Sequence, residues 1–216
     1  MIPSKTYLEK LDFKQLPQLA AFIVNENISQ HIDCESKAQY ESDIYSILEE
    51  EEKFYPDANV FVIKDVLNQL IGAIRVLKWN LKDVLPIEKI FDIDPSAWVN
   101  DDPLQNIFHI GRFAIKKEIR DVHLFKQLMV CAIAPVCQFS ENIAFAEIDA
   151  KLLRILNLLG ISTTVLGASV EYLGSETIPV AMSGLGLMDF YQKNKSLVAN
   201  AGALVHQTPA ENYSLV

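Results

Sequence analysis

The segment that decides the fold is NIFHIGRFAIKKEIRDVHLFKQLMVCAIAPVCQFSENIAFAEI, residues 106–148. Residues 106–116 are rich in Ile and Phe and predict a strand. After a short charged stretch, residues 122–139 are apolar and free of glycine, which predicts a buried helix perturbed at Pro135. Residues 143–148 predict a second strand. A strand, a helix and a strand in this order predict a parallel crossover in the middle of a sheet.

The sequence on either side extends this unit into a mixed sheet. Residues 80–105 are rich in Pro and Asp and predict a long irregular loop. The fold class is therefore α/β (α+β), with a mixed, mostly antiparallel central sheet flanked by helices. We expect one domain over residues 1–194 and a C-terminal tail over residues 195–216. The other predicted elements are a possible strand at 6–11, helices at 13–25, 40–54 and 149–159, a hairpin at 59–66 and 70–79, and strand-like runs at 162–174 and 176–187.

Composition excludes several classes of protein. The chain has 216 residues, of which 50% are hydrophobic and 22% are charged, enough for a globular core. Its 28 acidic and 19 basic side chains give a net charge of -9, which argues against nucleic-acid binding. No segment approaches the roughly 18 uninterrupted apolar residues of a membrane span. Because the N-terminal residues 1–14 lack the apolar region of a secretory signal, we expect a cytoplasmic protein.

The cysteines do not predict a metal site or a disulfide framework. Cys131 and Cys137 lie in an apolar segment, where free cysteines usually act as small buried hydrophobes. His31 and Cys34 lie together in a polar stretch, but no second cluster completes a four-ligand zinc site. We expect no bound metal and no bound cofactor.

Three stretches together carry a family resemblance: IGAIRVL at 71–77, IFHIGRFAI at 107–115, and LLRILNLLGISTTVLGASVEYLGSETIPVAM at 152–182. They resemble the GNAT N-acyltransferases, and more narrowly the acyl-homoserine-lactone (autoinducer) synthases and the long-chain N-acyl amino acid synthases. The resemblance implies a GNAT-like fold. It also implies transfer of a fatty acyl group from an acyl carrier protein, or from acyl-CoA, to a small amine such as an amino acid.

The resemblance assigns three candidate catalytic residues. Arg75 and Arg112 match the two strand arginines of the family and are expected to organise the acyl carbonyl or the acceptor's carboxylate. The family commonly has an acidic residue three positions before the second arginine, where this chain has His109. An imidazole can accept a proton in place of the acid, directly or through water. Candidates for the family's acidic pair before the hairpin are Asp43, Glu50 and Asp57.

Strand geometry sets a condition on this site. In a regular strand His109 and Arg112 point to opposite faces. A β-bulge between them is needed to bring both to one site. The alternative is a core histidine and a structural arginine paired with Asp149 or Glu147. The acidic run at 49–52 is expected to be a solvated helix face.

The resemblance also places the acyl donor. In GNAT enzymes the pantetheine lies along the central strand, and the pyrophosphate binds backbone amides at the start of the following helix. Residues 120–125, RDVHLF, keep the arginine of the usual loop but lack its glycines, which disfavours a nucleotide. A carrier-protein donor instead needs a basic docking surface, and the positive charges around this turn supply one, unless they are only a solvated loop. The donor-binding candidates are Phe113, Ala114, Ile115, Lys116, Lys117 and Arg120, and Arg112 and Lys126 add to the positive charge.

The general acid and the overall activity remain open at this stage. Leu156 stands where GNAT enzymes often have a tyrosine acid, so Tyr172, Ser169 and Thr164 are the candidate proton donors. A rival function is a small-group N-acetyltransferase that uses acetyl-CoA. Another is a non-catalytic GNAT-like module that binds an acyl species or a partner protein without turnover.

Overall fold

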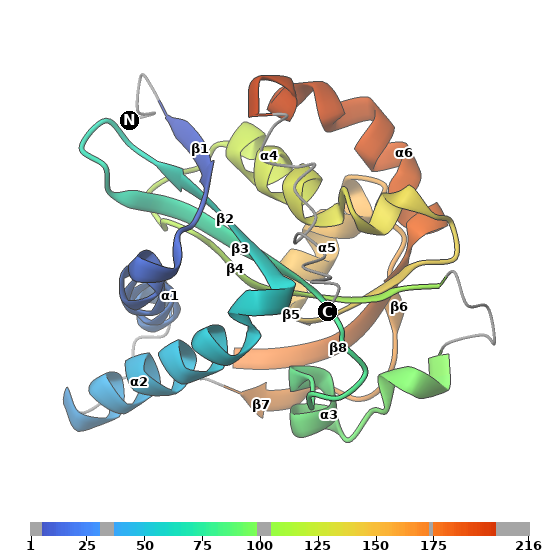
Figure 1. Ribbon diagram of the computed structural model, residues 1–216, viewed down its shortest axis with the longest axis horizontal. Coiled ribbons are helices and arrows are strands. Elements are labelled where there is room, and N and C mark those ends of the chain that lie inside the picture. Colours follow the sequence, from blue (N-terminus) through green and yellow to red (C-terminus); the bar gives the residue numbers. More distant parts are fainter. Residues whose placement is uncertain (1–5, 31–36, 99–104, 173–174, 202–216) are drawn as a thin grey trace, which may run out of the picture.

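The strands form one sheet (Figure 1). This holds for the residues that the computed structural model describes, which are 6–30, 37–98, 105–172 and 175–201. The eight strands follow the order β1-β2-β3-β4-β5-β8-β6, with β7 paired to β8. Only the central β4–β5 pair is parallel, so the sheet is mixed and mostly antiparallel as predicted. The strands are β1 (Tyr7–Lys10), β2 (Ala58–Lys64), β3 (Leu70–Lys78), β4 (Ile107–Ile115), β5 (Ile143–Asp149), β6 (Thr164–Val165), β7 (Val170–Tyr172) and β8 (Ser175–Ser183).

Helices cover both faces of the sheet (Figure 1). One face packs against α1 and α2, and the other packs against α4. Coverage on both sides explains why β3 is buried along almost its whole length, since strands buried on two faces are continuous apolar runs. The helices of the described residues are α1 (Leu16–Gln30), α2 (Lys37–Phe54), α3 (Pro86–Phe91), α4 (Val122–Ile133), α5 (Ala150–Leu158) and α6 (Gly184–Asn194).

The predicted crossover is confirmed, with α4 connecting β4 to β5. Asp121 begins α4 as its N-cap, and its side chain accepts a hydrogen bond from the backbone N–H of His123. The helix ends at Ile133, shortly before Pro135, because proline cannot continue the backbone hydrogen-bond pattern. The hairpin of β2 and β3 and the N-terminal strand β1 are also present where the sequence predicted them.

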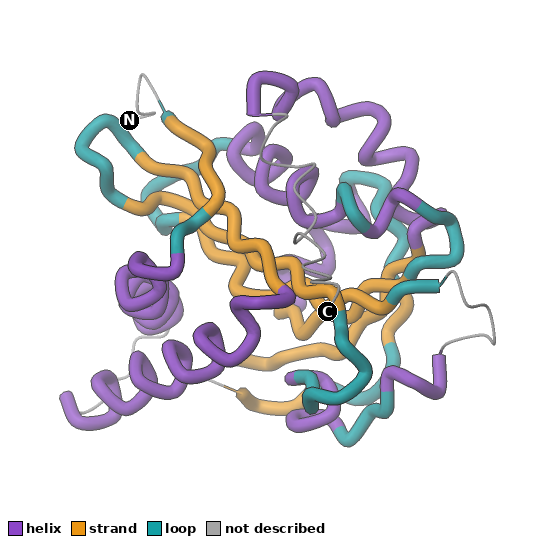
Figure 2. The backbone as a smooth tube through the Cα atoms, viewed as in Figure 1, coloured by secondary structure: helices purple, strands orange, loops and turns teal. Residues whose placement is uncertain are grey.

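Two predictions for the chain between the strands were wrong. The stretch predicted as a long loop contains α3, visible as a helix in Figure 2; Pro86 opens it and buried Ile87 anchors it. The run predicted as a strand up to residue 187 ends at Ser183, whose hydroxyl caps α6 by accepting from the Gly186 N–H. Pro86 at the start of α3 and the glycines Gly184 and Gly186 at the start of α6 hid the helical spacing.

The chain after α6 continues to pack on the domain. A 3-10 segment, Lys195–Ala201, follows α6 directly. Its Val198 is buried in the main core, and the carbonyl of Leu197 accepts a hydrogen bond from Gln127 of α4. Among the described residues, no helix combines the length and apolarity needed to cross a membrane.

Candidate active site

Strand β4 contains a β-bulge at Arg112. On β3, Ala73 and Arg75 are two residues apart, but their partners on β4, Ala114 and Gly111, are three apart. One extra residue is therefore inserted in β4, and Arg112 adopts a φ of 55° there. The bulge that the sequence required for this site is present.

The bulge reverses which side chains of β4 face each layer. Before the bulge, Ile110 faces the α4 side, and after it Phe113 does. The ring of Phe113 lies edge-on to that of Phe125 of α4, with the ring centroids 5.1 Å apart. Arg112 consequently joins His109 on the opposite face, the side of α1 and α2. The two candidate residues thus belong to one site although an odd number of positions separates them.

Two carboxylates of α2 hold the arginines. Glu51 Oε1 accepts from Arg75 Nη1 at 2.5 Å and from Arg112 Nε at 2.7 Å. Glu50 Oε1 accepts from Arg112 Nη2 at 2.7 Å. The side chain of Glu51 is 1% exposed and that of Glu50 is 24% exposed. The prediction that the acidic run is only a solvated face was therefore wrong for these two residues, because the arginines across the sheet give them partners.

His109 bridges the arginine network to a third carboxylate. Its Nδ1 lies 3.2 Å from Arg75 Nη2, and its Nε2 lies 2.9 Å from Glu147 Oε2 on β5. Because a guanidinium can only donate, Nδ1 accepts, and the ring proton on Nε2 is donated to Glu147. The residue is 1% exposed. Both ring nitrogens are thus engaged, and the alternative pairing of Glu147 with an arginine is replaced by pairing with His109.

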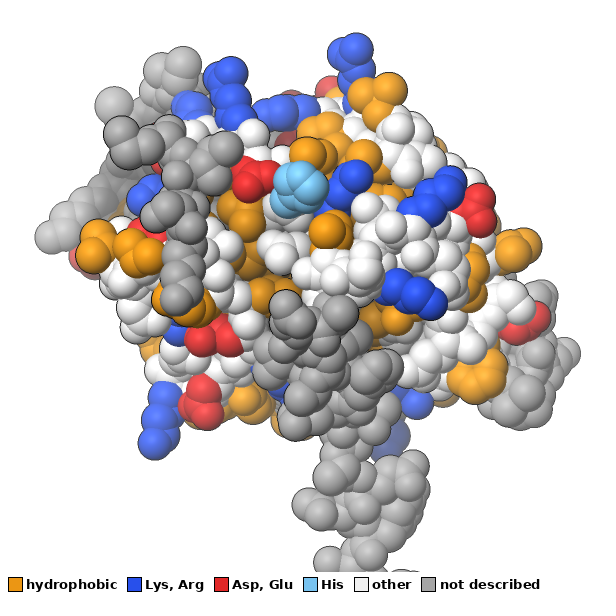
Figure 3. All heavy atoms as spheres, turned by 90° about the horizontal axis from the view of Figure 1, so that it is seen from above, with side chains coloured by type: hydrophobic (Ala, Val, Ile, Leu, Met, Phe, Trp, Pro, Cys, Tyr) orange, Lys and Arg blue, Asp and Glu red, His pale blue; other side chains and the backbone are white. Residues whose placement is uncertain are grey.

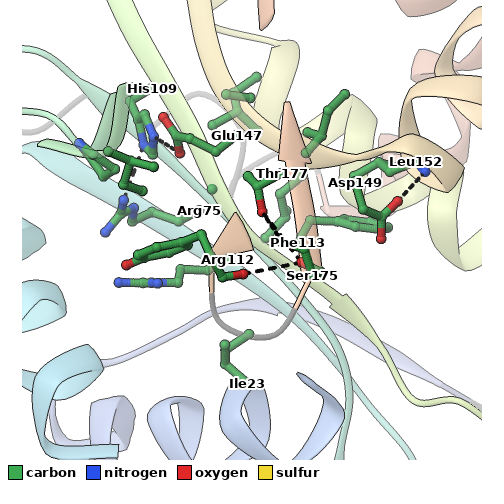
Figure 4. A pocket seen from close by; sticks show the side chains of 18 of the residues that line it. Ile23, Arg75, His109, Arg112, Phe113, Glu147, Asp149, Leu152, Ser175 and Thr177 are labelled. Atoms are coloured by element: carbon green, nitrogen blue, oxygen red, sulfur yellow. Dashed lines mark hydrogen bonds and ion pairs between the residues drawn. The ribbon is translucent and has the colours of Figure 1, made fainter. Parts of the chain in front are cut away.

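All of these side chains except that of Glu51 line a cavity of about 190 Å³ (Figure 4). Strands β4 and β5 pair only over residues 107–109 and 143–145 and continue beyond that point without pairing. Figure 4 shows His109 and Glu147 facing each other across these strands, with Phe113 and Leu152 farther away along the same cavity. The cavity therefore lies where β4 and β5 separate.

The residues that line the cavity come from both faces of the sheet, and we call these two sides its polar half and its apolar half. The polar half lies on the side of α1 and α2, and the apolar half on the side of α4 and α5. A ligand occupying both would have a polar reacting group and an apolar chain. The polar half contains Glu50, Arg75, His109, Arg112, Glu147 and Tyr172, and the apolar half contains Ile110, Phe113, Met129, Ala146, Leu152 and Leu156.

Electrostatics of the site follow from burial and from the guanidinium groups. Burial by itself would raise the pKa of Glu50, but the charges of Arg112 and Arg75 outweigh it and hold that pKa below its ordinary value. Burial by itself would lower the pKa of Arg112, but Glu51 and Glu50 more than compensate and raise it. Burial raises the pKa of Tyr172 above its ordinary value, so its phenol stays protonated at neutral pH.

The candidates for acyl-donor binding fall into two groups. Phe113 lines the cavity, whereas the side chain of Ala114 packs into the cluster formed with α1. Lys117 and Arg120 are exposed on the turn that precedes α4. Figure 3 looks at the end of the molecule where α4 begins and shows Lys and Arg side chains on this face. Arg112 does not contribute to that surface, because it is directed inward to α2.

The candidate proton donors also separate. Tyr172 lines the cavity. Leu156, at the position where GNAT enzymes often have a tyrosine acid, lines it as well. Ser169 donates to Glu176 and Thr164 is exposed on β6, and neither lines the cavity. Tyr172 is therefore the candidate that the fold brings to the site.

Sequence reasoning did not identify Glu51 and Glu147 as site residues. Glu51 was hidden in a run of four glutamates. Glu147 carried a usable signal, since it is the one charged residue in the apolar strand IAFAEI. Of the acidic candidates, Glu50 belongs to the site, while Asp57 lies in the 3-10 segment Tyr55–Asp57 and accepts from Asn80. No metal-binding cluster occurs among the described residues; His31 and Cys34 lie outside them.

Comparisons with known proteins rest on three-dimensional similarity. No protein-family model and no curated protein sequence matches this chain. FeeM, an N-acyl amino acid synthase from uncultured soil microbes, is 18% identical with a TM-score of 0.59, over 88% of this chain and 94% of that one. The AHL synthase LasI is 12% identical with a TM-score of 0.52, over 87% and 94%. An acetyltransferase of the GNAT family from Staphylococcus aureus Mu50 is 9% identical with a TM-score of 0.53, over 83% and 99%.

This chain has a GNAT-like fold. The fold expected from the motifs in β3, β4 and the C-terminal strands is thereby confirmed. Similarity at these identities establishes the fold, and the chemistry has to be argued from the cavity.

Proposed function

We propose that this protein is an N-acyltransferase that moves a fatty acyl group from an acyl carrier protein, or from acyl-CoA, to an amine such as an amino acid. The observation that carries the proposal is the cavity between β4 and β5, which joins an apolar half to a half with carboxylates, two arginines and a histidine. A fatty acyl chain fits the apolar half, and an amine acceptor fits the charged half. The thioester carbon would then lie between them, at the gap in the sheet.

The reaction is direct attack of the amine nitrogen on the thioester carbon. The new C–N bond forms as the C–S bond breaks, and the leaving thiolate takes up a proton. The pair of His109 and Glu147 supplies the base at this point. Arg75 Nε has no hydrogen-bond partner and is the donor available to the acyl carbonyl oxygen. Tyr172 at the cavity wall is the candidate donor to the thiolate.

The turn before α4 favours a carrier protein over CoA as the donor. The carboxylate of Asp121 already occupies the start of α4, where it accepts the backbone N–H of His123. A pyrophosphate at the same place would be repelled by the Asp121 carboxylate and could not accept the His123 N–H, which is already used. The neighbouring Lys117 and Arg120 are exposed and would attract an acidic carrier protein.

The test of the activity uses purified protein, acyl carrier proteins loaded with acyl groups of different lengths, and a panel of amines. We expect thiol release together with an acylated amine detected by mass spectrometry. His109→Asn should lower the rate by at least about 100-fold in protein that remains folded. Absence of thiol release with every donor and amine, from folded protein, would overturn the proposal and favour a module that only binds.

The donor is tested by charge reversal on the turn. We expect Lys117→Glu combined with Arg120→Glu to lower kcat/KM for the acylated carrier protein by about 10-fold and to weaken its dependence on salt. Acyl-pantetheine, which has no carrier protein, should be used equally well by both forms. Lys82→Glu, on the exposed loop after β3, is the matched control. Equal loss with both donors would argue against carrier docking at this turn.

A further inference from the structure

The charged half of the cavity has more negative than positive groups. The guanidinium groups of Arg75 and Arg112 face three carboxylates, those of Glu50, Glu51 and Glu147. A guanidinium binds a carboxylate best through two parallel N–H groups. In Arg112 the Nε and Nη2 pair is taken by Glu51 and Glu50, and in Arg75 both terminal nitrogens are engaged. Both guanidinium charges are therefore already compensated by carboxylates of the protein itself before a substrate carboxylate arrives.

Glu147 is a cavity-lining carboxylate of this cluster with a buried oxygen that lacks a hydrogen-bond partner. Its Oε2 accepts from His109, but its Oε1 is buried and has no partner. The side chain is 10% exposed and lines the cavity beside β7 and β8. A buried carboxylate oxygen without a donor is unfavourable, and a charged N–H donor satisfies it best. An ammonium group is such a donor.

Beyond the charged cluster, the cavity lining combines apolar side chains with the neutral polar side chains of Asn27, Ser175 and Thr177. Ile23 of α1 and Pro86 and Ile90 of α3 line the cavity on the same side of the sheet as His109. These residues offer contact to a hydrocarbon or aromatic body and no hydrogen bond to a carboxylate. An acceptor that combines an ammonium group with an apolar body therefore matches the lining.

We propose that Glu147 Oε1 binds the acceptor's ammonium group and takes its first proton, and that the preferred acceptor is an apolar primary amine without a carboxylate. This inference rests on the proposed acyl transfer and narrows its acceptor. The ammonium gives one proton to Glu147, and the free amine then attacks the thioester carbon. As the C–S bond breaks, Tyr172 protonates the departing thiolate and takes the second proton of the nitrogen in return. His109 is a positioning residue, because its Nε2–H fixes the Glu147 carboxylate.

The first test compares matched acceptors with the wild-type protein. The pairs are phenethylamine with phenylalanine, and tyramine with tyrosine, each with the same acyl thioester. We expect kcat/KM for the amine to exceed that for the amino acid by at least about 100-fold, since the carboxylate would meet an already negative site. The amino acid methyl ester should recover much of the loss. Equal or better use of the amino acids would overturn this inference while leaving acyl transfer intact.

The second test addresses Glu147 itself. Glu147→Gln keeps an oxygen for His109 but removes the negative charge. We expect it to lower kcat/KM for phenethylamine by at least about 100-fold. The ratio of kcat/KM for phenethylamine to kcat/KM for phenylalanine should fall by about 10-fold. Glu147→Asp should recover part of the rate, and Glu171→Gln, exposed on β7, should not differ from wild type.

The outcomes separate the two proposals. A Glu147→Gln protein that transfers acyl groups to phenethylamine as fast as wild type overturns the role of Glu147 alone. A wild-type protein that releases no thiol with any amine or amino acid overturns acyl transfer as well. If a variant is too unstable to assay, the wild-type acceptor series still decides the preference.

Discussion

Removing the negative charge of Glu51 should destabilise the domain more than any surface change on the same helix. Its Oε1 accepts from Arg75 Nη1 at 2.5 Å and from Arg112 Nε at 2.7 Å, and the side chain is 1% exposed. Breaking a buried ion pair by removing one partner costs about 3–5 kcal/mol. Because the amide oxygen in Glu51→Gln still accepts one hydrogen bond, we expect the lower end, about 3 kcal/mol.

The assay is urea and thermal unfolding of Glu51→Gln against wild type and against Glu52→Gln. At about 2–4 °C per kcal/mol for a chain of this length, the expected fall in Tm is about 6–12 °C. Glu52 is the next residue and is exposed, so its substitution should stay within about 0.5 kcal/mol. If the two variants differ by less than about 1 kcal/mol, the network does not stabilise the domain as argued here.

Three further predictions concern other parts of the structure. The pKa of Glu50 is lowered in the folded state, so its stabilisation is present above its unfolded pKa of about 4.3 and is lost as the pH falls through the lowered folded value; in urea titrations, Glu50→Gln should be less stable than wild type at pH 7, and the gap should close towards pH 3. A Cβ at Gly111 would lie 2.9 Å from the ring of the buried histidine, so Gly111→Ala should lower kcat/KM by at least about 10-fold, whereas Gly167→Ala, with no contact under 3.8 Å, should not. Burial raises the pKa of Cys131 and of Cys137 to about 12, so iodoacetamide at pH 8 should label them only after unfolding, as peptide mass mapping would show.

The central part of the fold was predictable because its signals are local. Alternating and continuous apolar runs, a charged turn and a long apolar helix specify β4, α4 and β5 without reference to the rest of the chain. The bulge at Arg112 was predictable in a different way, since two residues of opposite parity had to meet. Because side chains alternate between the two faces of a strand, a site that uses both residues requires a bulge between them.

The missed elements depended on contacts between distant parts of the chain. Gly184 resembled part of a strand, yet a Cβ there would lie 2.2 Å from the carbonyl oxygen of Phe139, so the glycine serves close packing at the start of α6. Glu51 resembled a surface glutamate, yet its partner Arg112 lies 61 residues away. A local pattern contains no information about such partners, so a buried acid and an exposed acid look alike in the sequence.

The bulge in β4 makes the strand sensitive to length rather than only to composition. Deleting one residue at the bulge would restore regular alternation, and the side chains of Phe113 and Ala114 would exchange layers. A large aromatic ring would then be placed against α1, and a methyl group would be left facing α4. Related chains should therefore tolerate substitutions along this strand more readily than any insertion or deletion between its two halves.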